Sequence, residues 1–394
     1  MDIYDESTAL HQRLGGKLEI HSKFRIKNQH DLSLVYTPGV AKACQEIARD
    51  ESRAYDLTIK RNTVAIVSDG SAVLGMGNIG PKAAIPVMEG KAMLFKEYAN
   101  IDAFPVCVNT QNSFEIISLV KNIAPVFSGI NLEDISAPRC FEIEQSLQNI
   151  GIPVFHDDQH GTAIVLLASL LNSAKVTKRA LSEMDVVING AGAAGTAIAE
   201  MLLCIGFDSL VCESVKEILV CDSKGIISEN RMDIVNNQTK LKLAKITNKE
   251  NRSGDLNDAI QHAHVFIGVS KGNVLTEEMV KKMHRGPIIF AMANPIPEIM
   301  PEAAKKAGAV VVGTGRSDFP NQVNNVLAFP GIFRGAIDVK AKMITNKMKI
   351  AAARALADCV ALPTADEILP SPLDRSVAPA IALSVQKAYE QFSE

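Results

Sequence analysis

Tryptophan is absent from this sequence of 394 residues, and aromatic residues make up only 5% of it. Sites that hold sugars or nucleobases by stacking depend on aromatic rings, so the composition argues against that kind of surface. A basic excess is also missing, because 41 Lys and Arg stand against 44 Asp and Glu, for a formal charge of −3. A nucleic-acid partner is therefore not expected.

Long apolar runs and a leader segment are missing too. No stretch approaches the roughly 18 consecutive apolar residues that a membrane span needs. The start, Met1–Asp5, has neither the basic nor the apolar region of a signal peptide. The seven cysteines are odd in number and none are spaced Cys-x-x-Cys, which favours reduced thiols over disulfides or a zinc site. We expect a soluble cytoplasmic protein with no membrane partner.

The residues that are present predict a two-domain α/β protein. Hydrophobic residues make up 47% of the chain, and its length exceeds that of one ordinary core. β-branched runs alternate with helical patterns, the rhythm of parallel sheets. The expected strands are Thr63–Ser68, Ala103–Asn109, Val154–His156, Val186–Asn189, Ile218–Cys221, Val265–Val269, Ile288–Ala291 and Ala309–Gly313.

Both ends of the chain are predicted to be helical. Leu10, Leu14 and Leu18 are spaced by four residues in the first sixty, and Ile344–Val360 and Ala378–Gln391 have helical patterns.

The sequence pattern changes at two places, which we take as the domain boundaries. A long apolar helix is expected after Gly161, and the strand pattern gives way to helices near Asn321–Asn325. We expect a Rossmann-type NAD(P)-binding domain at 161–324. An α/β substrate and metal-binding domain would occupy 1–160, helical to about residue 60, and would be completed by 325–394.

A G-x-G-x-x-G motif follows the expected strand at Val186–Asn189. Its members are Gly190, Ala191, Gly192, Ala193, Ala194 and Gly195. Gly190 permits the tight turn, Gly192 lets the backbone approach a pyrophosphate, and Gly195 allows close helix packing. The amides of the following helix then face the phosphates. We interpret this motif as the dinucleotide site.

Asp222 ends the next strand, where a carboxylate can accept hydrogen bonds from ribose hydroxyls. Because a carboxylate repels a 2′-phosphate, Asp222 favours NAD, although Lys224 can soften that repulsion and NADP stays possible.

The same motif occurs at Gly75–Gly80, but there Pro81 and Pro86 are expected to interrupt the helix that it would open. We interpret it as a tight structural turn beside the active site.

Acidic pairs occur at Glu133-Asp134 and, after a strand, at Asp157-Asp158. Acids in such places often cap helices or face solvent. Two pairs near the domain junction favour a ligand site, since ligands of α/β proteins gather at the carboxyl ends of strands. Carboxylate oxygens select Mg²⁺ or Mn²⁺.

Tyr36 precedes a Pro-Gly turn, and Lys91 opens an apolar stretch. Either side chain alone fits a structural role. Near a dication, a partly desolvated Lys91 would have its pKa lowered toward that of a useful base.

Seven ordered motifs from about Leu34 to Ala378 resemble the malic enzyme family, in its short bacterial form. They are Val35–Ala41, Ser68–Gly70, Glu89–Lys91, Leu132–Asp134, Phe155–Thr162, Ala293–Pro295 and Asn324–Val326. The resemblance implies that Tyr36 is the general acid and Lys91 the general base. It also implies that Glu133, Asp134 and Asp158 are metal ligands with Asp157 as an auxiliary acid, and that Asn294 and Asn325 contact substrate and nicotinamide.

The implied reaction is the oxidative decarboxylation of (S)-malate to pyruvate and CO₂. The metal holds malate and polarises its C2 oxygen, Lys91 takes the hydroxyl proton as hydride leaves, and Tyr36 protonates the enol. Ser71-Ala72 stand where large eukaryotic members have an arginine for a malate carboxylate, which leaves the partner of that carboxylate open.

Malate and pyruvate are the expected small-molecule partners, and a homodimer or higher homo-oligomer is expected. Three alternatives stay open: a malolactic-type enzyme, a 2-hydroxy acid dehydrogenase that does not decarboxylate, and a catalytically dead dinucleotide-sensing regulator. A dead regulator would be expected to lose Tyr36, Lys91 or a carboxylate, and none is missing.

Overall fold

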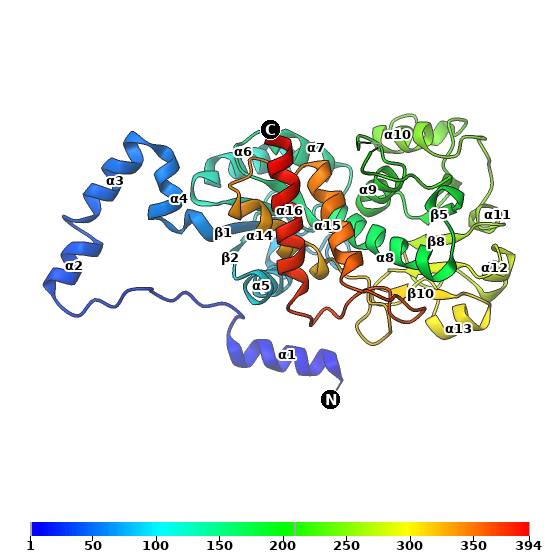
Figure 1. Ribbon diagram of the computed structural model, residues 1–394, viewed down its shortest axis with the longest axis horizontal. Coiled ribbons are helices and arrows are strands. Elements are labelled where there is room, and N and C mark those ends of the chain that lie inside the picture. The colour runs from blue at the N-terminus through cyan, green and yellow to red at the C-terminus, as the bar shows by residue number, and fades with distance from the viewer. Residues whose placement is uncertain (1, 209, 394) are drawn as a thin grey trace.

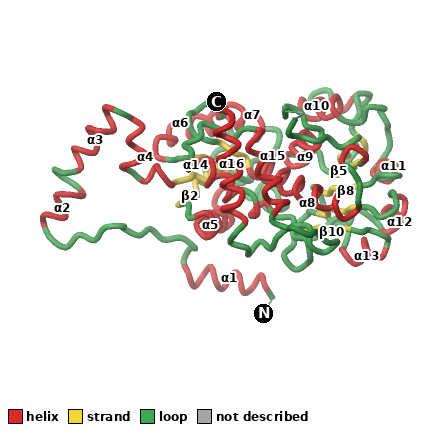
Figure 2. The backbone as a smooth tube through the Cα atoms, viewed as in Figure 1, coloured by secondary structure: helices red, strands yellow, loops and turns green. Residues whose placement is uncertain are grey.

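The computed structural model describes residues 2–208 and 210–393. Its strands form two separate groups, as Figure 2 shows, with long helices between and around them. Both groups are built mainly from parallel strands, so the predicted α/β class is confirmed.

The first sheet has the strand order β2-β1-β3-β4, with every pair parallel. The strands are β1 (Thr63–Ser68), β2 (Asp102–Cys107), β3 (Gly129–Leu132) and β4 (Val154–His156). All six residues of β1 are buried, as expected for a β-branched strand covered on both faces. In the register Val67 lies opposite Leu132, and Leu132 lies opposite His156. Three strands therefore end side by side.

Helices cover this sheet and connect its strands. They are α5 (Gly80–Ala99), α6 (Ser113–Ile123) and α7 (Arg139–Leu147), with a short π-helix, η4 (Asp157–Gly161), after β4. The prediction that Pro81 and Pro86 interrupt a helix is wrong, because α5 starts at Gly80 and contains both. Pro81 occupies the first turn, where a missing N–H costs nothing.

The second sheet has the order β10-β9-β8-β5-β6-β7, and only β7 is antiparallel. Its strands are β5 (Asp185–Asn189), β6 (Glu217–Asp222), β7 (Gly225–Ile226), β8 (Val265–Gly268), β9 (Ile288–Ala291) and β10 (Val311–Thr314). Its helices are α9 (Ala193–Leu202), α10 (Gln238–Ile246), α11 (Leu256–Ala259), α12 (Glu277–Lys282) and α13 (Pro301–Lys306). All eight expected strands are present; β3 and β7 were not predicted.

A central apolar helix, α8 (Thr162–Thr177), leads from the first sheet to the second. The C-terminal helices α14 (Phe329–Asp338), α15 (Asn346–Asp358) and α16 (Val377–Ser393) follow the short turn η7 (Asn325–Leu327). Phe329 and Phe333 of α14 pack on Phe95 of α5, with ring centroids 4.7 and 5.2 Å apart. The end of the chain thus returns to the helices of the first sheet (Figure 1).

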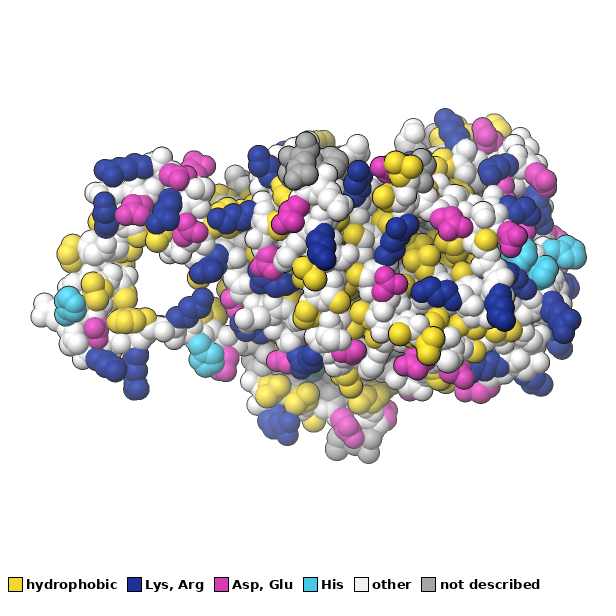
Figure 3. Space-filling view, in the orientation of Figure 1, with side chains coloured by type: hydrophobic (Ala, Val, Ile, Leu, Met, Phe, Trp, Pro, Cys, Tyr) yellow, Lys and Arg dark blue, Asp and Glu magenta, His cyan; other side chains and the backbone are white. Residues whose placement is uncertain are grey.

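Residues 2–62 form an N-terminal arm. It contains α1 (Ile3–Leu14), α2 (Gln29–Val35), α3 (Val40–Arg49) and α4 (Ala54–Leu57), with the short turns η1 (Glu51–Arg53) and η2 (Ile59–Asn62). None of residues 2–62 is buried. In Figure 1, α2 and α3 stand away from the rest of the molecule, and Figure 3 shows an opening between them and the body. The arm therefore has no core of its own.

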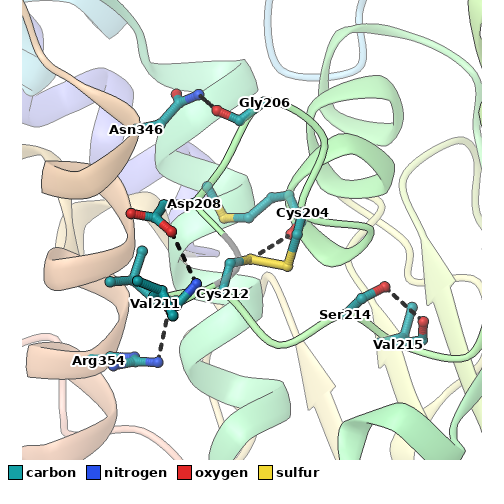
Figure 4. Close-up of a disulfide and its surroundings, with 11 residues drawn as sticks. Cys204, Gly206, Asp208, Val211, Cys212, Ser214, Val215, Asn346 and Arg354 are labelled. Carbon is teal, nitrogen blue, oxygen red and sulfur yellow. Dashed lines mark hydrogen bonds between the residues drawn. A yellow bond between two sulfur atoms is a disulfide. The ribbon is translucent and has the colours of Figure 1, made fainter.

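One expectation about the cysteines is wrong: Cys204 and Cys212 form a disulfide, with their Cα atoms 5.8 Å apart. The chain turns back after α9, which brings together two residues eight apart in sequence (Figure 4). The spacing is not a recognisable motif, so sequence alone did not indicate it. The five other cysteines are free thiols.

None of the helices within the described residues has both the length and the apolar character needed to span a bilayer.

Candidate active site

The side-by-side ends of β1, β3 and β4 place acidic residues at one edge of the first sheet. Asp69, Glu133 and Asp157 each follow the last residue of one of these strands. Because parallel strands end at the same edge, these side chains gather there although they are far apart in sequence.

Three carboxylates lie close enough together to hold one cation. One oxygen each from Glu133, Asp134 and Asp158 lies within 4.8 Å of the others. The backbone N–H of Asp134 donates to Asp158 Oδ2 at 2.8 Å. Asp134 Oδ2 is buried and has no hydrogen-bond partner among the described residues. An orphaned buried oxygen beside two further carboxylates fits a hard dication such as Mg²⁺ or Mn²⁺.

The raised pKa values of these acids show that burial and mutual repulsion make their charged forms unfavourable. Burial, followed by repulsion from Asp158 and Glu133, raises the pKa of Asp134 to about 9. Burial and the charge of Glu133 raise the pKa of Asp157 to about 8, although Lys91 acts to lower it. Burial also raises the pKa of Glu133 and of Asp158. The cluster therefore favours bound positive charge.

Lys91 supplies one such charge from α5. Its side chain is 7% exposed, and its Nζ forms ion pairs with Glu133 Oε1 and Asp157 Oδ2. Burial acts to lower the pKa of Lys91, but the charges of Asp157 and Glu133 outweigh it and raise the pKa above its ordinary value. The lowering that the sequence predicts refers to Lys91 beside a dication, whereas in the protein alone the adjacent carboxylates set the pKa.

Asp157 connects the site to the C-terminal part of the chain. The Asn325 amide donates to Asp157 Oδ2, the oxygen that also meets Lys91. A Cβ at Gly161 would lie 1.8 Å from Asp157 Oδ1, so only glycine fits there. Asp157 Oδ1 has no hydrogen-bond partner in the described part of the chain.

The glycine-rich segment Gly75–Gly80 forms a tight turn, as predicted. Val73 N–H donates to Gly77 O at 3.0 Å, and Gly75, Gly77 and Gly80 all have positive φ. A Cβ at Gly75 would lie 2.7 Å from the carbonyl oxygen of Asn294. The turn of the first sheet thus meets the Asn294 loop, which follows β9 of the second sheet.

The other glycine motif links β5 to α9, which starts at Ala193. Gly190 has φ 135°, and a Cβ there would lie 2.6 Å from Val269 O. A Cβ at Gly195 would lie 1.8 Å from Gly190 O, so these two glycines are needed for packing. Gly192 has open space, with no atom within 4 Å of a Cβ. The helix start at Ala193 and Ala194 therefore leaves room for an approaching phosphate.

Asp222, at the end of β6, is tied to two cations. Arg231 donates to both carboxylate oxygens, at 2.8 and 3.0 Å, and Lys240 Nζ lies 2.6 Å from Oδ2. Burial acts to raise the pKa of Asp222, but these hydrogen bonds hold it at about 2. Lys224 instead pairs with Asp233 at 3.2 Å. The side chain that is expected to face the ribose is thus part of an ion network.

Tyr36 is the one proposed catalytic residue that the chain does not bring to this edge. It caps α2 in the N-terminal arm, and 67% of its surface is exposed. The ion pairs of Lys91 are with Glu133 and Asp157. The helix α2, which Tyr36 caps, stands away from the body of the molecule (Figure 1).

Sequence reasoning missed two buttressing residues. Asn131, on β3, donates to Glu133 Oε2 at 2.9 Å. Arg139 donates to Asp69 Oδ2 at 2.7 Å and to Ser71 Oγ at 2.8 Å, and so holds the segment where larger relatives carry an arginine. Asn131 stayed hidden because its strand was not predicted. For Arg139, the acidic Asp69 directly after a buried strand was a signal that a cation lies nearby.

Comparison with known proteins agrees with this geometry. Residues 15–115 match the family model "Malic enzyme, N-terminal domain", and residues 159–389 match "Malic enzyme, NAD binding domain". The bifunctional malic/malolactic enzyme of Bacillus subtilis is 55% identical, covering 98% of this chain and 93% of that one. The NAD-dependent malic enzyme of Geobacillus stearothermophilus is 53% identical, covering 98% and 79%.

A solved structure has the same fold. The NAD-dependent malic enzyme of Thermotoga maritima is 48% identical and superposes with a TM-score of 0.92, covering 98% of this chain and 99% of that one. Two family models along the chain, relatives above 50% identity and a matching solved structure agree with the motifs and with the assembled carboxylates. This chain belongs to the malic enzyme family.

Proposed function

We propose that this enzyme oxidises and decarboxylates (S)-malate to pyruvate and CO₂, with reduction of NAD(P). The observation that carries the proposal is the group of three carboxylates around the unpartnered Asp134 oxygen, next to Lys91. The family membership of the chain supports the same reaction.

Glu133, Asp134 and Asp158 are the proposed ligands of Mg²⁺ or Mn²⁺. A divalent cation bound there supplies positive charge that offsets the carboxylates, lowers the pKa of Lys91 and polarises the C2 oxygen of malate. Lys91 is the proposed base, because its Nζ is buried among the same acids. Asp157 acts as the auxiliary acid that orients Lys91.

Asn294 and Asn325 are the proposed contacts to substrate and nicotinamide. Asn325 reaches the site through Asp157, and Asn294 lies against the turn at Gly75. Gly190, Gly192, Ala193, Ala194 and Gly195 would hold the pyrophosphate. Asp222 would face the ribose and favour NAD over NADP, because a carboxylate at the end of β6 would repel a 2′-phosphate.

Tyr36 is the proposed acid, and we infer that it acts in the site of a second copy in a homodimer. The arm carries Tyr36 with no buried residue around it. Leu32, Leu34 and Val35, on the same helix, are 46%, 55% and 41% exposed. Figure 3 shows hydrophobic side chains on the surface of the arm. An exposed apolar helix next to the acid fits a contact with another copy.

The domain division that this proposal uses joins 1–160 with 325–394 and leaves 161–324 as the dinucleotide domain. The packing of Phe329 and Phe333 on Phe95 supports it. The cytoplasm is the proposed location, since the reaction draws on the malate and dinucleotide pools there.

One assay tests the reaction. Purified protein is supplied with malate, NAD and Mn²⁺, and NADH, pyruvate and CO₂ are measured together. Equal amounts of all three support oxidative decarboxylation. NADH with oxaloacetate and no CO₂ would contradict it and indicate a simple dehydrogenase.

The malolactic alternative has a specific observation in its favour, because the relative that is 55% identical is named bifunctional. Lactate formed from malate without net NADH would show that second activity. Lactate is therefore assayed in the same reactions.

A further inference from the structure

A buried acid outside the proposed metal ligands holds the turn that carries one of them. Glu144 lies on α7 and is 7% exposed. Its Oε1 accepts the backbone N–H of His156 at 3.0 Å, and its Oε2 lies 3.0 Å from His160 Nε2. Both oxygens of one carboxylate are therefore occupied by the segment that contains Asp157 and Asp158.

The two anchor points lie on either side of the acidic pair. His156 is the last residue of β4, and His160 is in the π-helix η4, which spans Asp157–Gly161. The ring nitrogens of His156 have no hydrogen-bond partner among the described residues. At His156, the backbone N–H and not the ring makes the hydrogen bond to Glu144.

Glu144 is charged in this position. Burial acts to raise the pKa of Glu144, but His160 and Lys349 outweigh burial and hold it at about 2. A charged acceptor makes stronger hydrogen bonds than a neutral one. The contact between Glu144 and η4 is therefore a firm attachment.

The attachment bears directly on Asp158. That residue lies between the two anchors, and its Oδ2 is aligned on the other side by the backbone N–H of Asp134 at 2.8 Å. With both ends of the turn fixed, a carboxylate oxygen of Asp158 stays within 4.8 Å of oxygens of Glu133 and Asp134. Releasing η4 would let Asp158 move away from them.

We infer that Glu144 is a positioning residue that holds η4 so that Asp158 can bind the divalent cation. The inference rests on the proposed metal site. Partners that orient a metal ligand typically contribute about 10–100-fold to metal affinity. Glu144 itself touches neither substrate nor metal.

The test measures binding of Mn²⁺ to the full-length protein by electron paramagnetic resonance, without substrate. Glu144→Ala removes both anchors and is expected to weaken Mn²⁺ binding by about 10–100-fold. Glu144→Gln keeps one acceptor for the His156 N–H, and its amide can donate to a neutral His160 ring. We expect the Mn²⁺ affinity of Glu144→Gln to stay within about threefold of that of the unmodified protein, a difference of less than about 1 kcal/mol in binding free energy.

Two further variants keep the test decisive. Glu142→Ala changes an exposed acid on the same helix and should leave Mn²⁺ binding unchanged. His160→Ala removes one anchor and leaves Glu144 in place, so it replaces Glu144→Ala in the test if that variant does not fold. We expect His160→Ala to weaken Mn²⁺ binding less than Glu144→Ala does. In the double variant, the loss of Mn²⁺ binding free energy should be smaller than the sum of the two single losses.

Unchanged Mn²⁺ affinity in Glu144→Ala, or in His160→Ala if the former does not fold, would overturn the inference. Equal losses in Glu144→Gln and Glu144→Ala would overturn it as well, since the hydrogen bonds that glutamine keeps to His156 and His160 would then contribute nothing to Mn²⁺ binding. Failure of the metal site itself gives another result, because the unmodified protein would then bind no Mn²⁺.

Discussion

The proposed base and the proposed acid lie in opposite surroundings. Lys91 is 7% exposed and sits between Glu133 and Asp157, whereas Tyr36 is 67% exposed on the N-terminal arm. The ends of three adjacent strands assemble the surroundings of Lys91 within one chain. The helix that Tyr36 caps has no buried residue. The fold of one chain therefore builds the surroundings of the proposed base, whereas the proposal assigns those of the acid to a second copy.

The largest expected effect comes from dimers that combine two inactive variants, because such dimers test whether Lys91 and Tyr36 of one site belong to different chains. Lys91→Ala and Tyr36→Phe should each lose about 10²–10⁴-fold in turnover, the usual range for acid and base groups. In a mixed dimer with shared sites, one site keeps both groups and the other loses both. The purified mixed dimer should then have about half of full activity, because one of its two symmetry-related sites is intact.

Activity that stays at the level of the single variants after mixing would place Tyr36 in its own chain's site. Coexpression with two different affinity tags, followed by malate-dependent NADH assays on purified mixed dimers, makes the measurement. Mixing Lys91→Ala with itself is the control.

Single-turnover kinetics should separate the two roles. Tyr36→Phe should still show a burst of NADH, because hydride transfer needs only the base, while Lys91→Ala should show none. A burst in Lys91→Ala and none in Tyr36→Phe would interchange acid and base. Stopped-flow absorbance of NADH is the readout.

Asp158→Asn tests the proposed metal site beside Lys91. Loss of one anionic oxygen should weaken Mn²⁺ binding by at least about 100-fold, the upper end of what even indirect partners contribute. Mn²⁺ should then raise the melting temperature of the unmodified protein but not of the variant. The exposed Glu183→Gln is the matched control. Equal Mn²⁺ stabilisation of Asp158→Asn and the unmodified protein would remove Asp158 from the ligand set.

Gly192→Val and Gly77→Val compare the two glycine turns inside the body. Gly192 has open space and a φ of −90°, so valine fits the fold but occupies the phosphate approach. Each lost hydrogen bond to phosphate costs about 1.5–3 kcal/mol, so NAD affinity should fall at least tenfold. Gly77 has a φ of 76°, so valine there should lower the melting temperature instead. Calorimetric NAD titration would reverse the assignment if only Gly77→Val lost affinity.

Asp222→Ala should have the smallest effect. It frees Arg231 and Lys240, which now bind the carboxylate, to meet a 2′-phosphate. The preference for NADP over NAD should rise about tenfold, or 1.4 kcal/mol. The ratio of kcat/KM for the two cofactors measures it, with the exposed Lys281→Ala on α12 as control. An unchanged ratio would mean that Asp222 does not face the ribose.

Much of the fold could be predicted from sequence because local patterns carry it. β1, β4 and β9 have the predicted bounds, since buried β-branched runs are distinctive. The sequence did not predict β3, because Gly129–Leu132 is short and begins with a glycine. The reason for glycine lies far away in sequence, since a Cβ at Gly129 would lie 3.0 Å from the ring of Phe333. The Cys204–Cys212 disulfide was missed for a similar reason, because it depends on a chain reversal.

The sequence by itself determined which side chains were available: the two glycine motifs, the paired acids, Lys91 and Tyr36. These follow from backbone preferences and residue chemistry within a few neighbours. Only the tertiary structure decided that the charges of Asp157 and Glu133 raise the pKa of Lys91, that Glu144 contacts both ends of the turn of Asp158 and that Tyr36 is exposed on the arm. Each of these depends on charges or contacts between segments far apart in sequence, and packing alone sets those distances.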